Sequence, residues 1–78
     1  MNQGRYSVEF TINIYNTSPQ ELRSSLTGLG VDLNLEEKKE SDEKGEIVRI
    51  HIHTDDPYLI FDTCSQFGRL RQVTVEEI

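Results

Sequence analysis

The chain has 78 residues, 35% of them hydrophobic, and carries a formal net charge of −6 at pH 7. This length supports one small domain with a single core, and so acidic a surface repels the phosphates of a nucleic acid. No apolar run is long enough to cross a membrane, and the only cysteine, Cys64, has no partner for an intramolecular disulfide. We therefore expect a cytoplasmic protein that neither binds nucleic acid nor inserts into a membrane.

Residues 5–15, "RYSVEFTINIY", alternate between apolar and polar side chains. The apolar set is Tyr6, Val8, Phe10, Ile12 and Ile14, and the polar set is Ser7, Glu9, Thr11 and Asn13. A period of two predicts a half-buried strand.

The next segment predicts a helix near residues 18–29. Ser18 and Glu21 have the spacing of a capping box, and Pro19 suits the first helical position. An apolar stripe at helical spacing follows, and a glycine predicts the end of the helix: Leu22, Leu26, Leu29 and Gly30.

Three further strands and a second helix complete the pattern. Alternating Val31, Leu33 and Leu35 predict the second strand, and the charged residues that follow, up to Glu46, predict a solvated hairpin connection. Residues 46–54 and 70–77 predict the third and fourth strands. A helix near 56–67 is indicated by a cap, an apolar stripe and a terminal glycine: Asp56, Pro57, Ile60, Phe61, Cys64, Phe67 and Gly68.

The order strand, helix, strand, strand, helix, strand predicts an α+β fold. We expect a ferredoxin-like βαββαβ two-layer sandwich, with a four-stranded sheet and both helices on one face. The first and third strands are then expected to be parallel central neighbours. Their polar sides form an open face shared by six residues: Ser7, Glu9, Thr11, Arg49, His51 and His53.

Three segments of the chain carry a family resemblance. "RYSVEF", "LRSSLTGLGVDL" and "IVRIHIHTDDPYLIFDTCSQFGRLRQVTVEEI" together resemble the middle domain of the ATP-binding subunit of bacterial fatty-acid kinases, which are dihydroxyacetone-kinase-like proteins. The resemblance covers nearly all of the chain except the charged connection at 37–46. It implies that residues 1–78 are a single middle domain, excised from a longer kinase-like protein.

This resemblance implies a non-catalytic scaffold or dimerisation role. Its partners would be neighbouring kinase domains or another copy of itself, and in the parent protein a fatty-acid-binding partner protein. The sequence has no glycine-rich phosphate loop and no carboxylate cluster suited to magnesium-nucleotide binding, so we expect no nucleotide binding and no enzymatic activity from this chain alone.

The resemblance also implies a zinc site on the open face. In the family, both histidines of the HxH element and a first-strand cysteine are thought to bind zinc; His51 and His53 match, whereas Ser7 stands at the cysteine position. Glu9 is the candidate replacement ligand, because two histidines and a carboxylate form a recognised metal-binding set. A serine hydroxyl is a poor zinc ligand, so we expect zinc to bind weakly or not at all.

Two other interpretations remain. The histidines can be read simply as the polar half of an alternating strand, without a metal. An ACT-like regulatory domain, which binds a small molecule, shares the same order of elements, but the junction "YNTSPQE" lacks the glycine that such domains tend to carry between the first strand and helix.

Overall fold

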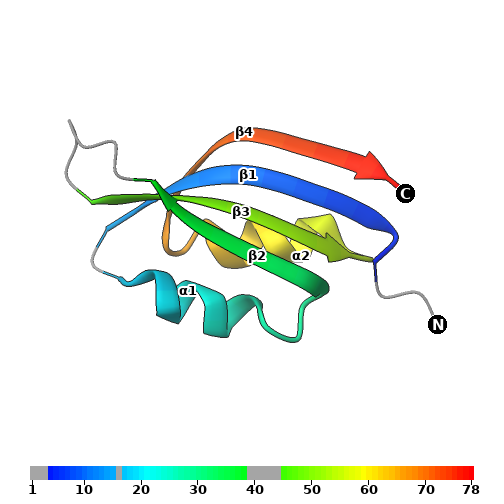
Figure 1. Cartoon of the computed structure of the whole chain (residues 1–78), viewed down its shortest axis with the longest axis horizontal. Helices are drawn as coiled ribbons and strands as arrows, with labels where there is room; N and C mark the ends of the chain where they lie inside the picture. Colours follow the sequence, from blue (N-terminus) through cyan, green and yellow to red (C-terminus); the bar gives the residue numbers. More distant parts are fainter. Residues whose placement is uncertain (1–3, 16, 39–44) are drawn as a thin grey trace.

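A computed structural model describes residues 4–15, 17–38 and 45–78, which form four strands and two helices (Figure 1). In chain order the elements are β1 (Tyr6–Ile14), α1 (Pro19–Leu26), β2 (Val31–Lys38), β3 (Glu46–Thr54), α2 (Pro57–Cys64) and β4 (Gly68–Glu77). Most of the predicted charged connection falls on residues 39–44, outside the described residues. Neither described helix has the length and apolar character needed to span a bilayer.

The strands form one sheet in the order β2-β3-β1-β4. Every neighbouring pair is antiparallel, so the expectation that the first and third strands are parallel was wrong. The reason is topological: the crossover through α1 makes β2 parallel to β1, and the hairpin then reverses the chain, so β3 runs against both. The central position of these two strands and the α+β class are confirmed.

Both helices lie under one face of the sheet (Figure 1). The core between the two layers contains the apolar sides of the central strands and the inner stripes of the helices: Val8, Phe10, Ile12, Ile14, Leu22, Leu26, Val48, Ile50, Ile52, Ile60 and Cys64. Helices of eight residues are marginal alone, so their stability depends on this packing. The opposite face of the sheet is left for polar side chains.

The helix starts were predicted correctly, but each helix ends three residues early. Ser18 and Asp56 are the N-caps, accepting hydrogen bonds from the backbone N–H groups of Glu21 and Leu59. The first helix ends at Leu26 because Gly28, with φ of +98°, turns the chain before Gly30 is reached. Leu29 and Phe67 still pack against the core, but from turns that follow the helices.

Both edge strands contain a β-bulge that the alternating pattern did not reveal. Asp32 in β2 and Gln72 in β4 have φ of 55° and 56°, and the register shifts beside each of them. An extra residue exchanges the faces of the side chains on its two sides. Consequently Val31 lies opposite His53, on the open side, and is 37% exposed, whereas Leu33 and Leu35 pack against the core.

We predict that replacing the first N-cap weakens the fold measurably. Ser18 Oγ accepts a hydrogen bond from Glu21 N at 3.2 Å, while Glu21 Oε2 accepts one from Thr17 Oγ1 at 3.0 Å. Ser18→Ala removes the first of these and should cost about 0.5–2 kcal/mol in urea denaturation. Ser24→Ala, the same change at an exposed position of α1, is the control and should be nearly neutral. Equal midpoints for the two variants would contradict a role of the cap.

Candidate functional site

The open face of the sheet collects the polar side chains of the two central strands, as predicted. Ser7 lies opposite His53, Glu9 opposite His51, and Thr11 opposite Arg49 in the pairing of β1 with β3. Directly opposite residues of antiparallel strands present their side chains on the same face. The sheet register therefore places all six predicted open-face residues together.

The actual contacts on this face are diagonal. Ser7 Oγ and His51 Nε2 are hydrogen-bonded at 2.8 Å, and Arg49 Nε donates to Glu9 Oε2 at 2.7 Å. The rings of His51 and His53 lie edge to face, with their centroids 5.0 Å apart. Each first-strand side chain thus contacts the residue two positions before its direct partner on β3, which the sheet twist brings within reach.

A further contact reaches this face from the bulge in β2. Asp32 Oδ2 lies 3.2 Å from His53 Nδ1. The sequence pattern did not predict this neighbour, because strict alternation does not anticipate the bulge. The available signal was the aspartate itself, since Asp and Asn adopt positive φ more readily than most residues.

Ser7 and His51 do not form part of a catalytic triad. The serine hydroxyl donates when His51 Nε2 is unprotonated, as in a nucleophile–base pair. The third member of a triad would be a carboxylate that orients the histidine. Here the two carboxylates near the pair are engaged elsewhere, Glu9 with Arg49 and Asp32 with His53.

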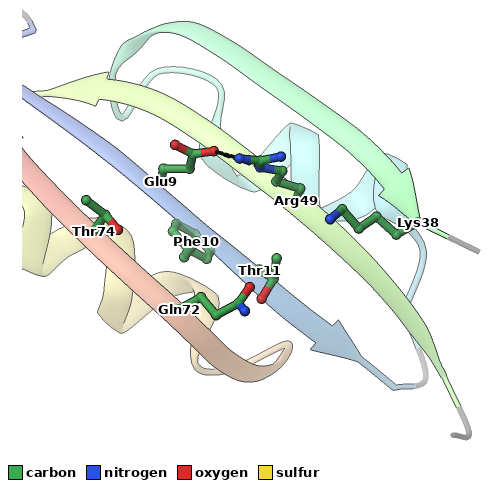
Figure 2. A pocket seen from close by; sticks show the side chains of 7 residues that line it. All are labelled: Glu9, Phe10, Thr11, Lys38, Arg49, Gln72 and Thr74. Atoms are coloured by element: carbon green, nitrogen blue, oxygen red, sulfur yellow. Dashed lines mark hydrogen bonds and ion pairs between the residues drawn. The ribbon is translucent and has the colours of Figure 1, made fainter. Parts of the chain in front are cut away.

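A polar pocket of about 280 Å³ lies on the open face, with lining residues from all four strands (Figure 2). Its lining is Glu9, Phe10, Thr11, Lys38, Arg49, Gln72 and Thr74. Figure 2 shows the Glu9–Arg49 pair bridging β1 and β3. Lys38, Gln72 and Thr74 supply hydrogen-bonding groups, so the chemistry available here is polar recognition of a small group.

The residues present do not fit the zinc site that the family resemblance implies. Across residues 4–15, 17–38 and 45–78, no three His, Cys, Asp or Glu side chains converge as metal ligands would. Glu9, the candidate third ligand beside His51 and His53, is paired with Arg49 instead. Ser7 is next to His51 but offers a neutral hydroxyl where zinc prefers a thiolate. The zinc set stays a prediction.

Cys64 cannot replace the missing thiolate. It is fully buried in α2, in the core on the other side of the sheet from the histidines. Desolvation by burial raises the pKa of its thiol to about 12, so it remains a neutral, apolar packing group at ordinary pH.

Comparison with known proteins gives one family. A family model described as the middle domain of FakA-like fatty acid kinase proteins matches residues 3–78. A search of curated proteins finds no match. Because the family model extends over nearly all of the chain, the chain belongs to the family of FakA-like fatty acid kinase middle domains.

Proposed function

We propose that this chain is a non-catalytic scaffold or dimerisation domain of a fatty-acid-kinase-like protein. The observation that carries the proposal is the family match, which runs from residue 3 to residue 78 and concerns the middle domain. Its partners would be neighbouring kinase domains or a second copy of the chain, with a fatty-acid-binding partner in the parent protein. A cytoplasmic location fits the single cysteine, Cys64.

The arrangement of the open face supports a structural role. Its charged side chains pair with one another: Glu9 with Arg49, and Asp32 with His53. Both pairs are partly exposed, so each contributes under about 1 kcal/mol to stability. Groups satisfied by their neighbours in this way suit a surface that positions other domains.

We also propose that the domain has the ferredoxin-like arrangement. The βαββαβ order of elements and the sheet order β2-β3-β1-β4 both support it. Two helices on one face leave the other face and both sheet edges for contacts with neighbouring domains (Figure 1).

The proposal predicts that the 78-residue chain neither binds nor hydrolyses ATP. Titration of the chain with magnesium-ATP in a calorimeter should give only the heat of dilution, and a coupled assay should give no ADP above the protein-free rate. The physical reason is that the open face offers paired charges, while magnesium-nucleotide sites need unpaired carboxylates and a phosphate-binding loop. Saturable heat, or ADP formation proportional to protein concentration, would overturn the proposed function.

A further inference from the structure

The outer side of β4 is an edge that no described strand covers. β4 pairs with β1 on its inner side, and the last inner hydrogen bond runs from Ile78 N to Arg5 O at 2.8 Å. β4 has ten residues, which is long for an edge strand, and contains no proline. Such an edge offers backbone N–H and C=O groups to another strand.

Two apolar side chains lie beside this edge. Val75 is opposite Val8, a core residue, so it points to the helix side, and Val73, two residues earlier, points the same way. They remain 46% (Val73) and 42% (Val75) exposed because the helix layer does not cover them fully. The bulge ends at Gln72, which leaves the run from Val73 to Glu77 as regular strand.

The charges along β4 are self-complementary in an antiparallel pairing. Its first half carries Arg69 and Arg71, and its second half carries Glu76 and Glu77. Two copies that run in opposite directions bring the basic half of one against the acidic half of the other. Centred on Thr74, the pairing sets Val73 opposite Val75 twice and brings Glu76 alongside the Arg71–Gln72 stretch of the second copy.

The other edge of the sheet has the opposite character. The exposed side chains of β2 are mainly acidic: Asp32, Glu36 and Glu37. Two β2 strands brought together would set acidic side chains against each other, which is destabilising. The charge pattern therefore distinguishes the two edges and favours β4.

We infer that β4 is the self-association surface of this domain, and that two copies pair their β4 strands antiparallel into one continuous eight-stranded sheet. The inference rests on the proposed scaffold or dimerisation function and identifies its surface. A strand-to-strand interface of this kind is small, so the association should be weak and depend on concentration and salt.

A charge-swap experiment with the 78-residue chain tests the inference. Sedimentation equilibrium up to about 1 mM should show a reversible dimer of the parent. Glu76→Lys and Arg71→Glu should each weaken self-association about tenfold, because each turns two symmetry-related attractions into repulsions. An equimolar mixture of the two variants should restore dimerisation, since both pairs become complementary in the mixed dimer. Glu36→Lys on β2 is the matched control and should dimerise like the parent.

A second variant tests the apolar contribution. Val75→Lys places a charge at a partly exposed position, so the fold should persist in circular dichroism while dimerisation is lost. A parent that stays monomeric, variants that dimerise like the parent, or a mixture that fails to recover would each overturn the β4 assignment. Dimers insensitive to every β4 variant would leave a dimerisation role standing on another surface, whereas ATP turnover is the result that removes the proposed function itself.

Discussion

Phe10→Ala is expected to destabilise the domain by about 3–5 kcal/mol, the largest loss of stability anticipated from a single change in this chain. Phe10 is 1% exposed on a central strand, and its ring packs edge to face against Phe61 with centroids 6.1 Å apart. A domain of 78 residues has a total stability of roughly 4–12 kcal/mol, so this substitution removes a large part of it. Urea denaturation followed by circular dichroism gives the value directly.

Tyr58→Ala is the matched control for this prediction. It also truncates an aromatic side chain to alanine, but Tyr58 is 83% exposed at the start of α2. Its free energy of unfolding should stay within about 0.5 kcal/mol of the parent value. If the two variants unfold at the same urea concentration, the side chain of Phe10 is not packed in the core that the structure describes.

The helices show which local features a sequence specifies. Ser18 and Asp56 were predictable as caps because capping depends on side chains within a few residues of one another. The helix ends were not, because the apolar stripe continues past them. Leu29 has the spacing of a helical core residue, yet it reaches the core from a turn after Gly28.

The strands show where pattern reading fails. β1 and β3 alternate strictly, and every side chain of the open-face prediction was assigned to the correct face. The edge strands β2 and β4 depart from the pattern at Asp32 and Gln72, where a positive φ adds one residue to the strand. A bulge of this kind depends on the partner strand as much as on its own sequence, so a single sequence gives only the weak hint of an aspartate.

The candidate site shows the same division. Period-two alternation placed Ser7, His51 and His53 on one face, and the contact between Ser7 and His51 follows from that placement. Which carboxylate goes to which cation did not follow. Glu9 was expected to join the histidines, but the diagonal reach across the strands gives it to Arg49, and the unforeseen bulge gives Asp32 to His53.

The largest change in binding is expected from Ser7→Cys. The parent chain should bind zinc weakly or not at all, because Ser7 stays a neutral hydroxyl beside His51. A thiol at this position can be deprotonated by the metal, and zinc between a thiolate and an imidazole nitrogen needs those atoms roughly 3.5 Å apart. The present 2.8 Å separation of Ser7 Oγ and His51 Nε2 has to open only slightly.

His53 is placed to complete the ligand set in that variant. Asp32 occupies its Nδ1 at 3.2 Å, which leaves Nε2 as the remaining donor atom and orients the ring as an outer-shell carboxylate does in zinc proteins. We expect Ser7→Cys to bind zinc at least about 100-fold more tightly than the parent, since outer-shell partners alone change metal affinity by about 10–100-fold.

Zinc titration against a competing chelator, with metal analysis of the purified proteins, measures the difference. The parent serves as the control for Cys64, whose buried thiol is present in both proteins, and Ser7→Ala should bind no better than the parent. His53→Ala in the Ser7→Cys background should return the affinity toward the parent value if both histidines contribute. Equal affinities for parent and Ser7→Cys would show that residue 7 and the two histidines do not converge on one metal position, and the open face would then be a polar surface without a latent metal site.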